Sequence, residues 1–404
     1  MNDTLQTSIA RLVRWVEEHD YKAFDPGDGN NSYLHALTFN NLLLERLLQQ
    51  SVYRAPFNLR PLFGIPPHRS TKGVGYIAWG SLKLYRLTGD PAHADRARKL
   101  LQWLIDNKAP GCKPYCWGND FSFSTRAGKI PRHEPTIVWS SLIGQAFLEG
   151  HAVLQDAKYL EIAASICDWI LTLPREQTAS GLCLSYVAFK QSSIHNSNML
   201  GAALLSQVGK LTGNKEGKAV AAEAMRYSCT RINPDASWYY GEDPKYHWID
   251  NFHTGYNLDS LKRYQQATGD LQFDGAMRRA FVYLKETFFE PSGRPKYYHN
   301  QALPIDIQCA AQAIDTLSFF SEDDPEALPL AQKVARWTID HMQAADGHFY
   351  YRDLGWAVNK TPMLHWGQGT MLKALANLSL ALKRGGPGAG ASAKAGSLEQ
   401  GHPA

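Results

Sequence analysis

Residues 195–231 read HNSNMLGAALLSQVGKLTGNKEGKAVAAEAMRYSCTR, and this stretch decides the fold. Its first part, 195–211, carries small and apolar residues on most sides, as a helix surrounded by protein does. The turn Thr212-Gly213-Asn214 follows, and 215–231 then carries charge on one face and apolar residues three and four positions apart. The stretch therefore predicts a helical hairpin made of one inner and one outer helix.

The same hairpin recurs along the chain. Other inner helices are predicted at 72–87, 136–153, 251–267, 305–320 and about 363–383, and other outer helices at 91–107, 156–173, 271–288 and 325–343. A short segment with a tyrosine follows each predicted outer helix, at Tyr115, Tyr186, Tyr239, Tyr297 and Tyr350, about every 55 residues with one insertion. Aromatic residues beside glycine predict short β-like runs there.

The sixth outer helix has to come from the start of the chain. A helix predicted over 4–19 would pair with the last inner helix and close the ring, whereas an open solenoid would need polar caps at both ends. We therefore expect an all-α single domain over residues 1–384, an (α/α)6 barrel or six-hairpin toroid with short β-like segments at the pocket mouth. A helix near 38–51 belongs to the lead-in. The Gly-, Ala- and Ser-rich residues 385–404 are expected to be disordered.

The composition excludes several classes of protein. A net charge of +4 without a long basic run argues against nucleic-acid binding. A run of about 18 apolar residues, as a membrane span needs, is not found, and without a visible secretory signal a cytoplasmic location is expected. The cysteines are expected to be reduced thiols, although Cys112 and Cys116 are close enough to form a metal or redox pair. No cofactor or metal is predicted, because no fingerprint for one occurs. The oligomeric state stays open.

Polar side chains gather at or before the starts of the inner helices, where a toroid has its pocket. Asp and Asn there can act as N-caps, but His and Trp are not favoured caps, so capping explains the set poorly. The abundance of aromatic residues suits a surface on which sugar rings stack. The candidate substrate-binding residues are Trp117, Asn119, His133, Glu134, His195, Asn196, Tyr240, Glu242, Trp248, Asn251, His365, Trp366 and Gln368.

The richest stretch runs from Trp238 to Tyr256. On a helix, Asp250 and His253 share one face, and Tyr256 lies within a turn of His253. A buried carboxyl group at this place could hold a proton near neutral pH, as a general acid must. The candidate catalytic residues are Asp250, His253, Tyr256, Asp306 and Asp120.

The segment Trp248-Ile249-Asp250-Asn251-Phe252-His253-Thr254-Gly255 resembles the W-x-D-(D/G/N) signature, with a glycine four residues later, of the unsaturated glucuronyl and rhamnogalacturonyl hydrolases. These are six-hairpin glycosidases whose motif aspartate is the general acid/base, so the resemblance implies that role for Asp250. The sequence departs from the pattern because a second catalytic aspartate in an early repeat is not evident, Asp120 being the nearest by position. The layout up to Leu364–Gly369 is also similar to six-hairpin proteins of bacterial exopolysaccharide gene clusters.

Three kinds of function remain open. Hydrolysis of an exopolysaccharide or a uronate-containing oligosaccharide would pair Asp250 with Asp306, Asp120, Glu134 or Glu242. A non-catalytic scaffold would instead bind glycan through Trp117, Trp248 and Trp366. The sequence favours hydrolysis.

The main chemical rival is a lyase or a uronate epimerase, which neutralises a substrate carboxylate and takes a proton with His or Tyr. Asn251, His253 and Tyr256 supply these residue types, and Arg126, Arg132 or Arg294 could pair with the uronate. A sugar 2-epimerase is a related alternative. It would use two opposed histidines from the set His195, His253 and His365.

Overall fold

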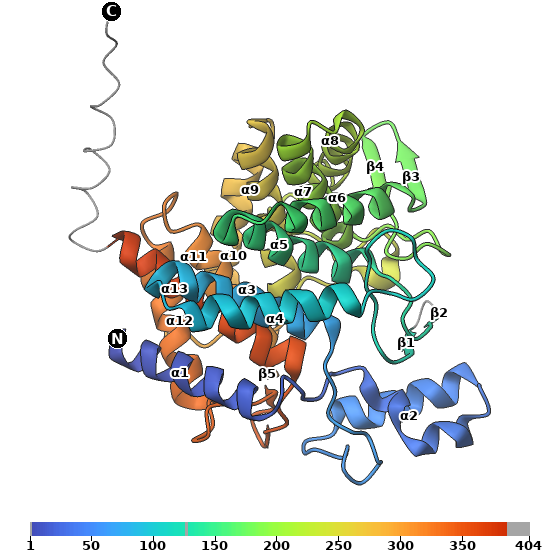
Figure 1. Ribbon diagram of the computed structural model, residues 1–404, viewed down its shortest axis with the longest axis vertical. Helices are drawn as coiled ribbons and strands as arrows, with labels where there is room; N and C mark the ends of the chain where they lie inside the picture. The colour runs from blue at the N-terminus through green and yellow to red at the C-terminus, as the bar shows by residue number, and fades with distance from the viewer. Residues whose placement is uncertain (1, 126–127, 386–404) are drawn as a thin grey trace, which may run out of the picture.

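The computed structural model describes residues 2–125 and 128–385 and confirms the all-α toroid. Within these residues, inner helices form a closed ring in which each helix packs on the next and the last packs back on the first (Figure 1). They are α3 (Thr71–Thr88), α5 (Ile137–Leu154), α7 (His195–Thr212), α9 (Asn251–Thr268), α11 (Ile307–Phe319) and α13 (Thr370–Gly385). The predicted tail from residue 386 onward and Arg126 lie outside the described residues.

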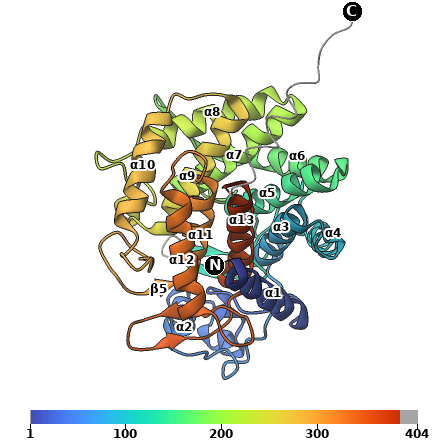
Figure 2. The same cartoon turned by 90° about the vertical axis from the view of Figure 1, so that its left-hand side faces the viewer.

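An outer helix packs against each inner helix. These are α4 (Pro91–Asp106), α6 (Ala157–Leu171), α8 (Lys215–Cys229), α10 (Asp274–Thr287), α12 (Ala327–Met342) and, against α13, the N-terminal α1 (Asn2–Glu18). Figure 2 shows α1 next to α13. The Arg11 guanidinium donates hydrogen bonds to the carbonyls of Ala344 and Ala345, both at 2.7 Å. The predicted closure of the ring by the N-terminal helix is therefore confirmed.

Local sequence explains both the turns and the close approach of the inner helices. Gly213 ends α7 with a φ of 78°, and the Asn214 side chain caps α8 by accepting the Gly217 N–H at 2.9 Å. A Cβ on Gly144 of α5 would lie 2.5 Å from a methyl group of Leu204 of α7, so a larger residue there would require Leu204 to move. Small residues on most sides are thus the signature of a helix packed between two others.

By length and composition, helix α5 is apolar enough to cross a membrane, although the sequence analysis predicted no such span. In the ring, 72% of its 18-residue window is buried. The apolar composition of α5 therefore matches what its place as an inner helix requires.

Short strands lie at the end of the ring where the inner helices begin. Hairpins join β1 (Phe123–Thr125) to β2 (Gly128–Ile130) and β3 (Arg175–Thr178) to β4 (Gly181–Leu184), and β5 (Ile305–Asp306), β6 (Arg352–Asp353) and β7 (Val358–Asn359) form an antiparallel sheet. The tyrosine segments were predicted to be these strands, but all five named tyrosines, Tyr115, Tyr186, Tyr239, Tyr297 and Tyr350, lie outside them.

The tyrosine segments instead complete the inner helices. The first N–H of a helix has no partner within the helix. Here four of the five tyrosine segments, all but the one at Tyr115, cross the start of the inner helix before them in the sequence, and a tyrosine carbonyl accepts that N–H. The pairs are Ile137 with Tyr186, His195 with Tyr240, Asn251 with Tyr297 and Ile307 with Tyr351, at 2.9–3.1 Å. At the last repeat, Phe24 from the lead-in takes the place of the tyrosine and accepts from Leu364 at 2.7 Å.

The start of α13 differs from the prediction of one continuous helix. Leu364–Gly369 form a π-helical turn, and the α-helix begins only at Thr370. A π-turn widens the backbone and is common at functional sites. It carries His365 and Trp366.

The lead-in holds two short 3-10 turns, Asp28–Asn31 and Tyr33–Thr38, and α2 (Leu42–Arg54), which begins later than the predicted 38–51. Figure 1 shows α2 standing apart from the ring, beside the β1–β2 hairpin. The Ala55 carbonyl accepts a 2.8 Å hydrogen bond from the Asn359 amide, which joins this segment to the last repeat.

Candidate active site

A cavity of about 770 Å³ opens where the inner helices begin. Its size is in the range of sites for small molecules and short oligosaccharides. Aromatic side chains make up much of its wall: Trp139, Tyr186, Tyr240, Tyr246, Trp248, Phe252, Tyr256, Tyr297, Tyr298 and Trp366. Such rings offer flat apolar faces and polar edges, which suit the packing of a sugar.

Asp250 borders this cavity and is the N-cap of α9. One carboxylate oxygen accepts the His253 backbone N–H at 2.9 Å. The other accepts the Trp248 indole N–H at 3.0 Å and lies 2.6 Å from His253 Nδ1. The carboxylate is therefore engaged by three donors, and its clearest task is to hold His253 and Trp248 in place.

His253 also borders the cavity, and its side chain is partly exposed there. Because a carboxylate only accepts, the short contact with Asp250 places a proton on Nδ1 of the ring. Nε2 makes no hydrogen bond within the described part of the chain. It is therefore available to accept a proton from a bound molecule or to return one.

His365 also lies close to a carboxylate, before the start of α13, which is two inner helices after α9 in the ring. It borders the cavity from the π-turn, and its Nδ1 lies 2.6 Å from a carboxylate oxygen of the fully buried Asp25. The same oxygen accepts the His365 backbone N–H at 3.1 Å. Burial lowers the pKa of His365, with Lys72 and His68 acting in the same direction and Asp25 against it. A neutral imidazole is the form that a general base needs.

The Asp25 carboxylate is itself held by two histidines. Its second oxygen lies 3.4 Å from His68 Nε2, which is 3.5 Å from Asp120. Burial opposes the imidazolium, but Asp25 raises the pKa of His68 to about 9. Asp120, predicted to be catalytic, does not border the cavity and instead faces His68. Burial raises the pKa of Asp120, and His68 opposes this.

Tyr256 borders the floor of the cavity one turn after His253. Its hydroxyl lies 3.0 Å from the Tyr76 hydroxyl and accepts a hydrogen bond from the Gln308 amide at 2.8 Å. Burial raises the pKa of Tyr256, so its hydroxyl stays protonated and can serve as a donor.

Asp306, also predicted to be catalytic, is fully buried and does not border the cavity. It accepts from Arg352 at 2.5 Å, from the Trp366 indole at 2.6 Å and from the Gln308 backbone at 2.9 Å. Burial raises the pKa of Asp306 and Arg352 opposes this. The residue caps α11 and positions Trp366, so it is no partner for Asp250 in hydrolysis.

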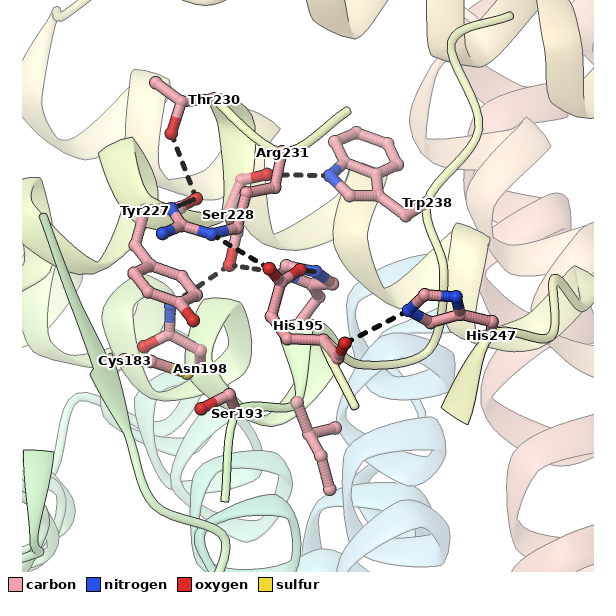
Figure 3. A network of polar contacts seen from close by, with 12 residues as sticks. Cys183, Ser193, His195, Asn198, Tyr227, Ser228, Thr230, Arg231, Trp238 and His247 are labelled. Carbon is pink, nitrogen blue, oxygen red and sulfur yellow. Dashed lines mark hydrogen bonds and ion pairs between the residues drawn. The ribbon is translucent and has the colours of Figure 1, made fainter. Parts of the chain in front are cut away.

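His195 lies in the interior, beside the cavity wall but not in it. Figure 3 shows it within a polar network in which both ring nitrogens are occupied. Nε2 lies 2.8 Å from Glu242 and Nδ1 lies 3.2 Å from the Ser228 hydroxyl. Glu242 borders the cavity and also accepts from Arg231 at 3.2 Å. The hydrogen bond from His195 lowers the pKa of Glu242, with Arg231 adding to this and burial opposing it.

The other predicted binding residues divide into two groups. Asn119, Asn196, Tyr240, Trp248 and Trp366 border the cavity, as do His365 and Glu242. Trp117, His133, Glu134, Asn251 and Gln368 do not.

Those that do not border the cavity have structural surroundings. Trp117 is buried in the core and donates to the Leu104 carbonyl at 3.0 Å, whereas His133 is exposed on a loop. Gln368 bonds both backbone groups of Phe349, at 2.8 and 2.9 Å. Nearness to the start of an inner helix therefore did not show whether a side chain faces the cavity or faces away from it.

Some residues at or behind the cavity wall were missed. Asp25 has no signal in the sequence, because its partner His365 is 340 residues away. Trp139 lies in the first turn of α5, where polar and aromatic residues were expected to gather, so its position was a usable signal. Lys72, in the group Thr71-Lys72-Gly73 at the start of α3, was one of the predicted helix-start groups and does border the cavity. Arg132 and Arg294, proposed partners of a uronate, do not border the cavity. Among the described residues, no three His, Cys, Asp or Glu side chains could together hold a metal ion.

The fold and the residues at the starts of the inner helices define the class: a six-hairpin helical toroid with an aromatic-lined cavity at that end. Solved structures of this fold include an unsaturated glucuronyl hydrolase specific for heparin, which aligns with 13% identity over 94% of this chain and 97% of that chain, with a TM-score of 0.62. A cellobiose 2-epimerase from Bacillus thermoamylovorans aligns with 10% identity over 79% and 90%, with a TM-score of 0.61.

A polysaccharide lyase aligns with 12% identity over 78% of this chain and 91% of that chain, with a TM-score of 0.58. At such identities the likeness shows the fold, and the chemistry has to be argued from the cavity. No family model matches the sequence, and no curated protein matches it either.

Proposed function

We propose that this protein is a sugar epimerase or isomerase that moves a proton on the carbon next to the carbonyl of an open-chain reducing sugar. The observation that carries the proposal is the pair of histidines that border one cavity, each with Nδ1 2.6 Å from a buried carboxylate. A carboxylate behind an imidazole fixes its tautomer and stabilises the imidazolium that forms during proton transfer.

The proposed reaction uses the two histidines, His253 and His365, as proton donor and acceptor. One histidine removes the proton from C2, and the electron pair of that C–H bond moves to the carbonyl oxygen, which gives an enediolate. The other histidine returns a proton, either to the opposite face of C2, which gives the epimer, or to C1. In the second case the proton of O2 passes to O1, the carbonyl forms at C2, and the product is the ketose. Atoms and electrons balance without a cofactor.

The arrangement of the carboxylates at the cavity supports an epimerase or isomerase over a glycoside hydrolase. Those that border it within the described residues are Asp250, Glu242 and Asp243. Glu242 is held by His195 and Arg231, and Asp243 pairs with Lys245 at 2.7 Å. A pair of acids facing one bond, as glycoside hydrolysis uses, is therefore not formed by these residues.

Hydrolysis remains the second candidate, because Asp250 borders the cavity next to Trp248. In that case Asp250 would donate its proton to the glycosidic oxygen. The link with exopolysaccharide formation and the cytoplasmic location stay predictions of the sequence.

The test is proton exchange in heavy water. Reducing sugars and uronate oligosaccharides are incubated with the protein in D2O, and deuterium at C2 is followed by NMR, together with new reducing ends and absorbance near 235 nm. We expect deuterium at C2, and at least about 100-fold less in His365→Asn. New reducing ends without deuterium, or wild-type exchange in His365→Asn, would contradict the proposal. Binding without any reaction would favour a scaffold.

A further inference from the structure

Four lysines of the described chain are buried: Lys72, Lys83, Lys262 and Lys373. A buried ammonium is costly unless an anion accompanies it. Three of them have one. Lys83 lies 3.9 Å from Glu149, Lys262 pairs with Asp323, and Lys373 pairs with Asp315.

Lys72 is different. Within residues 2–125 and 128–385 its ammonium makes no ion pair and no hydrogen bond, although its side chain is only 4% exposed. Around it are three aromatic rings, Trp139 at 4.6 Å, Tyr76 at 5.8 Å and Tyr256 at 5.9 Å. Ring faces attract a cation but replace only part of the water that it has lost.

Lys72 is also the one among these four lysines that borders the cavity. The unpaired charge therefore lies where a bound molecule can reach it. Burial lowers the pKa of Lys72 to about 7, with Asp25 opposing, which reflects the same lack of a partner. An anion that entered the cavity would restore the charged form.

We infer that Lys72 is the receptor for the carboxylate of an acidic sugar, so that the cavity selects uronates over neutral sugars. A carboxylate carries one charge and matches one ammonium, whereas a phosphate monoester carries nearly two. The inference rests on the proposed function in that it names the substrate class of the same cavity. It concerns binding, so it can fail or hold independently of proton exchange.

Binding to a matched pair of sugars tests it. Cellobiose and the disaccharide with glucuronate in place of its non-reducing glucose are titrated calorimetrically at low ionic strength. We expect the acidic disaccharide to bind at least 10-fold more tightly, a difference of about 1.4 kcal/mol. We expect Lys72→Met to remove this preference and Lys72→Arg to keep most of it. Equal affinities in the wild type, or an unchanged preference in Lys72→Met, would overturn the inference.

Stability without ligand provides a second test that does not depend on choosing the right sugar. At pH 6, Lys72→Met removes an unpaired buried charge and is expected to raise Tm by about 1–2 °C. Lys373→Met is the matched control: the same substitution on another inner helix leaves Asp315 buried alone, and Tm should fall. A fall in Tm for Lys72→Met as well would show that Lys72 serves the fold, against the inference.

Discussion

At the scale of the residue, the cavity depends on two carboxylates that hold histidines in place. Asp25 and Asp250 each accept a backbone N–H and face the Nδ1 of a histidine. This leaves the outer nitrogen of each imidazole without a partner in the described chain. The resemblance around Trp248 directed attention to Asp250 as the acid, and the structure shows that the motif also orients His253.

Asp250→Asn tests this role. Asparagine is a good N-cap, so the fold and Tm should change little. The amide can no longer stabilise an imidazolium on His253, and we expect C2 proton exchange to fall at least about 100-fold. Circular dichroism and NMR-detected exchange check the two parts, and an active Asp250→Asn variant would remove His253–Asp250 from the mechanism.

At the scale of the element, the π-turn before α13 sets the position of His365 and Trp366. Asp306 holds the Trp366 indole from the start of α11, and Arg352 of β6 holds Asp306 in turn. Sequence alone could not show this. The pattern at 363–383 predicts one helix, because a π-turn differs from an α-turn by a single residue in its hydrogen bonding.

Asp306→Asn separates a catalytic from a supporting role. Asparagine keeps an acceptor for the Gln308 N–H and the Trp366 indole, but the Arg352 charge is left buried without its partner. We expect unfolding to become easier by about 3–5 kcal/mol. Activity per folded molecule, measured well below the new Tm, should stay within about 10-fold of the wild type. Complete loss of activity in folded protein would restore Asp306 as a catalytic candidate.

At the scale of the whole molecule, the periodicity of the sequence was sufficient to predict the ring of helices but not the arrangement of side chains around the cavity. Hairpins such as 195–231 repeat a local pattern, so their number, order and closure could be predicted. Which side chains lie next to each other at the cavity depends on contacts between residues far apart in the sequence, such as Asp25 and His365, which are 340 positions apart. A single sequence does not indicate that two residues so far apart in it are in contact.

Ring closure can be tested through α1. Leu12 is fully buried in the interface of this helix, whereas Leu47 on α2 is 58% exposed. Leu12→Ala should cost about 2–5 kcal/mol of unfolding free energy, and Leu47→Ala about 0.5 kcal/mol or less. Denaturant titration measures both. Similar small losses for the two variants would mean that α1 contributes little to holding the ring.

The tyrosine carbonyls at the helix starts have a consequence for how the molecule opens. Each inner helix from α5 to α11 is completed by a segment of the following repeat, and the last repeat is completed by Phe24. One hairpin therefore cannot detach without exposing an N–H of its neighbour to solvent. Fluctuations at the mouth of the cavity, which in many enzymes are local, should here spread around the ring as a shared event, and hydrogen exchange at these amides should approach the rate of global unfolding.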